Sequence, residues 1–294
     1  MKSKTVRGNW SLKTKKFGST SVFFICIFFF LFGFFGSSLF SKSQDDVFGH
    51  RPRPRFLEWA NDATRYNLLP AGESGDDSIT SVPFQILSWK PRALYFPNFA
   101  NSEQCESIID MARAGLEPSI LALREGETEE NTKGVRTSSG MFISAFEDKT
   151  GILDVIEEKI ARATMIPRVN GEAFNILRYE VGQRYMSHYD AFNPAEYGPQ
   201  KSQRMASFLL YLSDVEDGGE TMFPFENGLN MDGSYGYEDC IGFKVRPRQG
   251  DGLLFYSLLH NGTIDPTSLH GSCPVIKGEK WVATKWIRDQ EQDD

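Results

Sequence analysis

Two histidines and one aspartate have the residue types and the spacing of a metal site. His188 and Asp190 are two positions apart, and residues i and i+2 of an extended segment point to the same face, so their imidazole and carboxylate can converge on one ion. His270 is the best candidate for a third ligand, because it follows the apolar run 252–256 and a polar loop. Two histidines and one carboxylate on one face leave coordination positions open, which is the arrangement of non-haem Fe(II) sites that react with O2.

Lys280 adds a feature that a lone His-x-Asp triplet lacks. Such a triplet, taken by itself, is usually a solvated strand end. Lys280, however, opens the apolar and aromatic segment 281–287, which reads as the inner wall of a small barrel. A lysine there is costly unless it pairs with an anion, because an unpaired buried charge loses its hydration. A dicarboxylate cosubstrate would supply that anion.

Three segments together resemble the prolyl 4-hydroxylases, which are 2-oxoglutarate- and Fe(II)-dependent dioxygenases, and look most like the short, membrane-anchored plant type. The resemblance extends from about Phe84 to Arg288 and shows no departure at the metal or cosubstrate positions. The ten-residue step from His270 to Lys280 matches the spacing of that family. The segments are 183–190 (QRYMSHYD), 218–224 (GGETMFP) and 270–281 (HGSCPVIKGEKW).

The resemblance implies a set of cofactors and a role for each candidate residue. Fe(II) would be held by His188, Asp190 and His270, and Lys280 would pair with the distal carboxylate of 2-oxoglutarate. O2 would be the second cosubstrate, and L-ascorbate would restore iron that uncoupled turnover oxidises. Two other residues are alternatives for these roles: His260 for the distal metal ligand and Lys277 for the lysine that binds the cosubstrate. Both are weaker candidates, because their spacing does not match that of the family. Tyr185 and Thr221 match positions whose side chains hydrogen-bond the cosubstrate in relatives, so the resemblance implies the same role for them.

A proline-containing peptide is the substrate that the resemblance implies. Pro-rich segments already have the polyproline II conformation and therefore lose little entropy on docking. A polar loop as long as 123–139 is either disordered surface or a lid. The resemblance implies a mobile loop that covers the substrate, so we expect Arg136 to contact the peptide. Aromatic side chains are the other candidates for the groove, although each could instead pack in the core; they are Tyr179, Tyr189, Phe192 and Trp281.

Seven short runs separated by Gly, Pro, Asn and Asp predict strands. This pattern is typical of an antiparallel double-sheet jelly roll, which would bring the three metal-site residues to one mouth. We therefore predict a mainly β domain with flanking helices (α+β) around a double-stranded β-helix (jelly-roll) core. The strands are expected at 174–179, 185–189, 205–212, 220–223, 242–245, 251–256 and 281–287.

Two amphipathic helices precede these strands. The first begins at a capping residue, Ser102, and stops at Gly115. The second begins near Gly151, and its apolar face is expected to contain Ile152, Val155, Ile156 and Ile160. Both are expected to support the sheet.

The N-terminus carries a basic leader and then an apolar stretch. Residues 1–20 contain six lysines and arginines and no acid, and residues 21–40 contain no charge. About twenty such residues span a bilayer. The most apolar part, 22–35, is shorter, so a cleaved signal peptide is the alternative. The long basic leader favours a retained signal anchor with its N-terminus in the cytosol, which is a single-pass type II topology.

This topology divides the chain into five segments and predicts a location. The catalytic domain would lie in the lumen of the endoplasmic reticulum or the Golgi, held by the membrane anchor. The segments are a cytosolic tail (1–20), a transmembrane helix (21–40), an Arg- and Pro-containing stem (41–81), the dioxygenase domain (82–289) and an acidic tail (290–294).

Charge and cysteine content limit the partners and suggest covalent features. The chain has a net charge of −7 even though its first segment is basic, which argues against nucleic acid as a partner. Of the lumenal cysteines, Cys240 and Cys273 both flank the second half of the catalytic domain, so we favour a bridge between them and a free Cys105, although connectivity does not follow from sequence. Asn261 begins an Asn-Gly-Thr acceptor site for a lumenal glycan.

Three functions remain open at this point. The first is a prolyl 4-hydroxylase that acts on extensin- or arabinogalactan-like cell-wall proteins, alone or in an oligomer with related hydroxylases. The second is a related hydroxylase with another substrate. The third is a non-catalytic, membrane-anchored jelly roll that binds Pro-rich chains. The complete metal set together with Lys280 favours an enzyme over a binding module.

Overall fold

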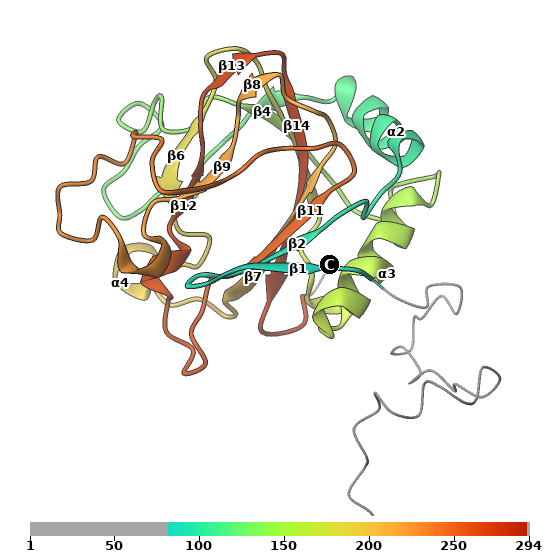
Figure 1. The fold of residues 1–294 in the computed structure, drawn as a ribbon. Coiled ribbons are helices and arrows are strands. Elements are labelled where there is room, and N and C mark those ends of the chain that lie inside the picture. The colour runs from blue at the N-terminus through green and yellow to red at the C-terminus, as the bar shows by residue number, and fades with distance from the viewer. Residues whose placement is uncertain (1–81, 293–294) are drawn as a thin grey trace, which may run out of the picture. The chain divides into compact units, whose positions relative to one another are not determined.

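The computed structural model describes residues 82–292, whose arrangement is shown in Figure 1. The predicted tail, anchor and stem (1–81) lie outside the described residues, as do the last two positions of the acidic tail. Within residues 82–292, no helix has both the length and the apolar character needed to cross a bilayer. The prediction of a mainly β domain with flanking helices is confirmed, since antiparallel sheets dominate the described part of the chain.

An eight-stranded antiparallel sheet forms the larger layer, in the order β1-β2-β11-β7-β14-β5-β4-β3. Its longest strands, β7 (Arg204–Tyr211) and β14 (Lys280–Arg288), pair with each other near the middle of the sheet. Both therefore have neighbours on two sides, which fixes their side chains in place. The remaining strands are β1 (Gln85–Trp89), β2 (Arg92–Phe96), β3 (Glu117–Pro118), β4 (Ser139–Ile143), β5 (Phe174–Tyr179) and β11 (Gly252–Tyr256).

A four-stranded sheet in the order β10-β9-β12-β6 forms the second layer, and a separate pair, β13-β8, lies near one end of the domain (Figure 1). All of these strands are short. Their bounds are β6 (Tyr185–His188), β8 (Asp217–Gly218), β9 (Thr221–Phe223), β10 (Phe243–Val245), β12 (His270–Ser272) and β13 (Val275–Lys277).

The central strands of the large sheet are buried on both faces. Alternate residues of β14 point to opposite sides, as the two-residue period of a strand requires. Trp281 and Ala283 belong to one apolar cluster, which also includes Ile108 and Ile156 of the two long helices. Val282 belongs to a second cluster, which includes Phe223 and Val245 of the small sheet. Lys280 shares the parity of Val282 and faces the small sheet.

Two long helices, α2 (Ser102–Arg113) and α3 (Ile152–Thr164), cover one face of the large sheet (Figure 1). The capping residue of α2 is Asn101 and not Ser102 as predicted: the Asn101 side chain accepts from the Gln104 amide at 2.8 Å, and the Gln104 side chain accepts from the Asn101 amide at 3.0 Å. This reciprocal pair satisfies two amide groups at the helix end. The remaining helices are short: α4 (Pro194–Tyr197), η2 (Arg168–Asn170), η3 (Glu226–Gly228) and η4 (Pro266–Ser268).

The buried apolar face of α3 differs from the predicted one at Val155, which was expected on it, and at Leu153, which was not. Val155 is 38% exposed, whereas Leu153, Ile156 and Ile160 are buried. These three positions have the spacing i, i+3 and i+7 of one helix face, and Val155 falls outside that stripe.

Candidate active site

The two histidines and the aspartate converge where β6 and β12 pair. His188, the last residue of β6, lies directly opposite His270, the first residue of β12, and Asp190 follows β6 by two positions. Asp190 Oδ1 lies 3.6 Å from His188 Nε2, and Asp190 Oδ2 lies 3.4 Å from His270 Nε2. The candidate ligand atoms of all three residues lie within 4.8 Å of one another. One ion can therefore contact all three side chains.

Backbone carbonyls orient both imidazole rings. His188 Nδ1 donates to the Met186 carbonyl oxygen at 2.8 Å, and His270 Nδ1 donates to the Ser268 carbonyl oxygen at 3.0 Å. A carbonyl only accepts, so Nδ1 carries the proton in each ring and Nε2 keeps its lone pair. This is the tautomer that binds a metal through Nε2, with the other nitrogen held by a neighbour.

Charge within the cluster favours the metal-binding forms. Burial tends to raise the pKa of the Asp190 carboxyl, but His270, His188 and Arg204 together hold it well below its usual range. Burial lowers the pKa of His270 to about 4, although Asp190 opposes that shift. Near neutral pH Asp190 is therefore an anion and His270 is neutral, which are the forms that coordinate a metal.

A glycine allows the strands to approach closely beside the distal histidine. A Cβ added at Gly271 would lie 2.9 Å from the Tyr185 carbonyl oxygen and 3.0 Å from Met222 Cε. Strand β12 lies between β6 and β9, and a side chain at this position would push those strands apart. The glycine after His270 therefore belongs to the construction of the site.

Tyr185 and Arg136 lie beside the first histidine. The ring of Tyr185 stacks on the His188 ring with centroids 3.6 Å apart, and the Arg136 guanidinium lies 4.7 Å from the Tyr185 ring centre. Arg136 Nε donates to Ser138 Oγ at 3.3 Å, whereas Arg136 Nη2 is buried with no partner among the described residues. Such a donor is costly to leave unpaired, so this corner can accept a carbonyl or carboxylate oxygen from a ligand.

Lys280 lies in a pocket of polar and aromatic groups between the two sheets. Its side chain is fully buried, and Nζ donates to Ser272 Oγ on β12 at 2.8 Å. The Tyr179 and Tyr211 ring centres lie 5.3 and 5.9 Å from Nζ. The Tyr211 hydroxyl donates to Thr221 Oγ1 at 2.8 Å, which brings Thr221 into the same group.

Burial lowers the pKa of Lys280 to about 7, although Glu220 opposes the shift. Among the described residues, Lys280 forms no ion pair. The ammonium thus lacks an anionic partner, and a ligand carboxylate would relieve the cost of its burial. The donor set of the cluster fits Fe(II), and this lysine fits the far carboxylate of 2-oxoglutarate.

Three residues of the lysine pocket do not follow from the sequence reasoning. Tyr179 was a candidate for either the peptide groove or the core, and it is buried directly opposite Lys280 in the β5–β14 register. Tyr211 and Ser272 were not expected at the site. The two-residue period of β5 and β14 could have indicated Tyr179, because paired residues of neighbouring strands point to the same face.

The predicted contact between Trp281 and a peptide is wrong. Trp281 is 1% exposed and lies in the cluster on the helix side of the sheet, facing away from Lys280. Tyr189 and Phe192 are only half-buried, and the Tyr189 hydroxyl donates to the Pro266 carbonyl oxygen at 3.1 Å. The sequence reasoning missed Arg204, whose guanidinium lies 3.7 Å from the Trp286 ring centre and contributes to the low pKa of Asp190.

The two competing residues lie away from the cluster. His260 is exposed in the loop after β11. Lys277 has a side chain that is 70% exposed and pairs with Glu216 at 2.6 Å. Neither contributes to the buried site, so His270 and Lys280 remain the candidates.

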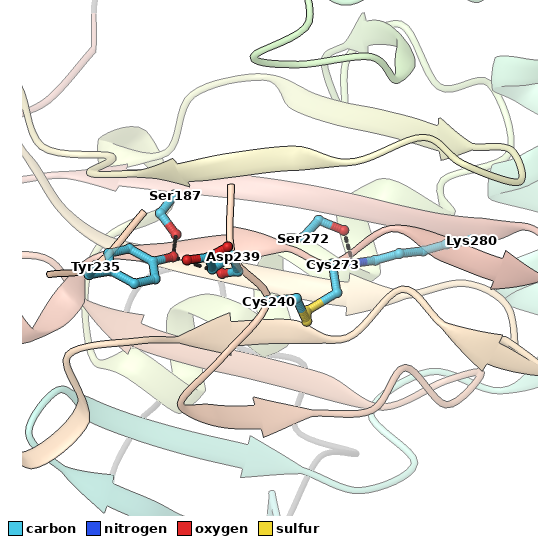
Figure 2. The surroundings of a disulfide bond; sticks show 7 residues. All are labelled: Ser187, Tyr235, Asp239, Cys240, Ser272, Cys273 and Lys280. Atoms are coloured by element: carbon cyan, nitrogen blue, oxygen red, sulfur yellow. Dashed lines mark hydrogen bonds between the residues drawn. A yellow bond between two sulfur atoms is a disulfide. The ribbon is translucent and has the colours of Figure 1, made fainter. Parts of the chain in front are cut away.

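A disulfide joins a loop to the residue that directly follows the strand of the distal histidine. Cys240 pairs with Cys273, as predicted, and Cys105 is free and buried. Figure 2 shows the bridge between Cys240 and Cys273, the residue that follows Ser272 of β12. The Tyr235 side chain, from the same loop as Cys240, reaches Ser187 on β6, with the two hydroxyls 2.7 Å apart. The loop is therefore attached both to β12 and to β6.

Comparison with known proteins gives one matching family model and several relatives with high sequence identity. A family model described as the 2OG-Fe(II) oxygenase superfamily matches residues 174–288. The chain is 65% identical over 285 residues to "Probable prolyl 4-hydroxylase 9" of Arabidopsis thaliana, covering 97% of this chain and 98% of that one. It is 56% identical over 282 residues to "Prolyl 4-hydroxylase 13" of the same plant, covering 96% and 98% of the two chains.

Among solved structures, the chain is similar to the viral collagen prolyl hydroxylase of Paramecium Bursaria Chlorella virus-1 in its 2OG complex. The identity is 25%, the TM-score is 0.49, and the alignment covers 67% of this chain and 95% of that one.

Proposed function

The chain belongs to the prolyl 4-hydroxylase family of 2OG-Fe(II) oxygenases, and from that premise we propose that it hydroxylates carbon 4 of peptidyl proline. 2-Oxoglutarate and O2 are consumed, and succinate and CO2 are released with the hydroxylated peptide. The observation that carries the proposal is Lys280, a buried ammonium without an ion-pair partner in the described residues, on the face of the large sheet that the small sheet covers. A metal cluster alone would fit many oxygenases.

His188, Asp190 and His270 hold the metal in this proposal. Both imidazoles present Nε2, because their Nδ1 protons are donated to backbone carbonyls. Asp190 supplies the negative charge. When bound, Fe(II) supplies the centre at which 2-oxoglutarate and O2 react. L-Ascorbate keeps that metal reduced.

Lys280 binds the distal carboxylate of 2-oxoglutarate. The Ser272 hydroxyl holds Nζ at 2.8 Å, so the ammonium is already in place before the cosubstrate binds. Thr221, which accepts from the Tyr211 hydroxyl, is the second polar group that we assign to the cosubstrate. Tyr185 flanks His188 and not Lys280, so we assign its contact with the cosubstrate to the metal end.

Arg136 and Tyr189 are the residues that we assign to the peptide. Arg136 has a buried guanidinium nitrogen without a partner in the described residues, which supports a contact with a peptide carbonyl. The loop that precedes Arg136 lies against α4: the Glu125 amide donates to the Glu196 carbonyl oxygen at 3.0 Å, and Arg124 Nε lies 2.8 Å from Glu196 Oε2. A few exposed contacts hold this loop, which supports its role as a lid that opens for the peptide.

The cellular setting is also part of the proposal. The basic leader and the uncharged segment 21–40 support a type II anchor in the endoplasmic reticulum or Golgi membrane, with the enzyme in the lumen. Asn261 is exposed in a turn where the Thr263 hydroxyl donates to its side-chain oxygen at 2.7 Å, which supports glycosylation there. Substrates would be Pro-rich secretory proteins such as those of the cell wall, and assembly with related hydroxylases belongs to the same setting.

Succinate release tests the substrate. The full-length enzyme is incubated with Fe(II), 2-oxoglutarate and ascorbate, and with a Pro-rich peptide, a Lys-rich peptide or none. Stimulation by the Pro-rich peptide alone is expected. Stimulation by the Lys-rich peptide would indicate a related hydroxylase with another substrate. An iron-loaded protein that binds the Pro-rich peptide without turnover would indicate the non-catalytic binding module.

A further inference from the structure

We propose that Ser207 is a positioning residue that holds Asp190 as a one-oxygen metal ligand and thereby keeps a coordination position open for O2. The inference rests on the proposed function, because it concerns the metal centre of that reaction. The buried hydroxyl of Ser207, in strand β7 of the large sheet, contacts the candidate metal ligand Asp190.

The hydroxyl of Ser207 makes a short bond to the carboxylate. Ser207 Oγ donates to Asp190 Oδ2 at 2.5 Å, and both residues are buried. Ser207 is 0% exposed, so water does not compete for this bond. A hydrogen bond to an ionised acceptor is among the strong ones, and it is stronger when water is excluded.

The backbone gives Ser207 little freedom to move. It lies in β7, where it pairs with Phe255 of β11 on one side and with Trp286 of β14 on the other. Leu209 and Tyr211, the next residues of the same parity, belong to the apolar cluster between the two sheets. Ser207 is thus a polar residue in an otherwise apolar and aromatic row, at the position that faces Asp190.

The bond makes the two carboxylate oxygens unequal. Oδ1 faces His188 Nε2 at 3.6 Å and accepts no hydroxyl proton from residues 82–292, whereas Oδ2 faces His270 Nε2 at 3.4 Å and accepts the Ser207 proton. We therefore assign Oδ1 to the metal and Oδ2 to Ser207. Without the hydroxyl, the carboxylate could rotate so that both oxygens face the metal.

Whether Asp190 binds the metal through one oxygen or two determines how many coordination positions stay open. If Fe(II) were bound with six coordination positions, three protein ligands and two oxygens of 2-oxoglutarate would occupy five of them and leave one. A second oxygen from Asp190 would fill that position. By holding Oδ2, Ser207 would keep it available for O2.

The test compares Ser207→Ala with Ser207→Thr in the full-length protein. Fe(II) affinity is measured by titrating the metal-free protein. Nitric oxide, used as a stand-in for O2, is then added to the Fe(II)- and 2-oxoglutarate-loaded protein and followed by electron paramagnetic resonance. Ser207→Ala is expected to lose roughly 10- to 100-fold in Fe(II) affinity, the usual effect of removing a group that orients a ligand. Its nitrosyl signal should also be weaker per iron or altered in shape, and Ser207→Thr should restore both.

Ser257→Ala is the matched control. Ser257 is also a serine that is 1% exposed, but its hydroxyl has no partner among the described residues. This variant should bind Fe(II) and nitric oxide like the wild type. Thermal unfolding of each variant shows whether it is folded. If Ser207→Ala does not fold, Ser207→Cys, which has a similar volume and only a weak donor, is measured instead and should show the same losses.

Unchanged Fe(II) affinity and an unchanged nitrosyl signal in Ser207→Ala would overturn the inference. Equal losses in Ser257→Ala would also overturn it, because they would show a general effect of removing a buried hydroxyl. Neither readout needs a peptide or turnover. A wild-type protein that fails to bind Fe(II) would count against the proposed function itself, so the two failures are distinguishable.

Discussion

Lys280 Nζ donates to the hydroxyl of Ser272, two residues beyond His270 on the same short strand, at 2.8 Å. Strand β12 therefore carries both the distal imidazole and the group that positions the ammonium. The metal-binding end of a 2-oxoglutarate molecule would lie beside His270 of β12. Its far carboxylate would be bound by Lys280 of β14, which Ser272 of β12 holds. The metal cluster and the lysine pocket thus form one site.

Lys280→Ala should weaken 2-oxoglutarate binding by roughly 10- to 100-fold, because a charge-assisted hydrogen bond contributes about 1.5–3 kcal/mol. Calorimetric titration of the Fe(II)-loaded protein measures the dissociation constant. Lys277→Ala is the control, since its side chain is exposed and pairs only with Glu216. Similar dissociation constants for Lys280→Ala and the wild type would contradict the assignment.

The affinity for 2-oxoglutarate should fall as pH rises above 7. Burial lowers the pKa of Lys280 to about 7 in the absence of an anion, so above that pH the amine is largely neutral and must take up a proton when the carboxylate binds. The loss should approach about tenfold per pH unit. Titrations in two buffers with different ionisation enthalpies should show proton uptake at pH 8 but little at pH 6.

Lys280→Arg provides the matched comparison for this pH dependence. Arginine stays charged over the whole range, so any binding that the variant retains should proceed without proton uptake. Equal proton uptake by the wild type and by Lys280→Arg would assign the titration to another group.

Glu172→Gln should lower the free energy of unfolding by about 2 kcal/mol near pH 7, because it removes the anion between two arginines that are mostly buried. Glu172 Oε2 lies 2.6 Å from Arg204 Nη2, and Oε1 lies 2.6 Å from Arg288 Nε. Thermal unfolding measures the loss. Glu216→Gln removes an exposed carboxylate from a surface ion pair and should change stability little.

The contribution of Glu172 should also depend on pH. Burial tends to raise the pKa of Glu172, but Arg204 and Arg288 together keep it below its ordinary value. The stabilisation is therefore fully present above the ordinary glutamate pKa and is lost as pH falls through the depressed value. The difference between the wild type and Glu172→Gln should shrink over that acidic range, and a constant difference would argue against the ion pair as its source.

The double variant Cys240→Ser/Cys273→Ser should be less stable by roughly 2–4 kcal/mol, because the bridge closes a loop within the domain. Its Fe(II) affinity should also fall, since the loop contacts β6 beside His188 through Tyr235 and Ser187. Treating the wild type with a thiol reductant should reproduce both changes. A loss of stability with unchanged Fe(II) affinity would show that the loop does not position the metal strands.

The three metal-site residues and Lys280 could be identified from the sequence. Their roles follow from residue spacing and from the free-energy cost of burying an unpaired charge. His188 and Asp190 share a face through the period of a strand, and Lys280 needs an anion wherever it is buried. The predicted strands correspond to β5, β6, β7, β9, β10, β11 and β14 within about two residues at each end. Strand β12 was not predicted, because its sequence, His-Gly-Ser, contains no apolar or β-branched residue that would indicate a strand.

Other features depend on contacts that sequence reasoning does not specify. Trp281 follows Lys280 directly and therefore points to the opposite face, where the helices cover it. Tyr179 belongs to the lysine pocket only because β5 pairs with β14 in one particular register. Val155 lies one position off the buried stripe of α3, a difference that depends on how the helix is rotated against the sheet.

The measurement that tests the central claim most directly is mass spectrometry of a Pro-rich peptide after incubation with the full-length enzyme, Fe(II), 2-oxoglutarate, ascorbate and O2. We expect one added oxygen atom on proline, one succinate for each hydroxyproline formed, and neither product with His188→Ala. Peptide-independent succinate formation without hydroxyproline would contradict the substrate assignment. Hydroxyproline formed by His188→Ala at the wild-type rate would contradict the metal site.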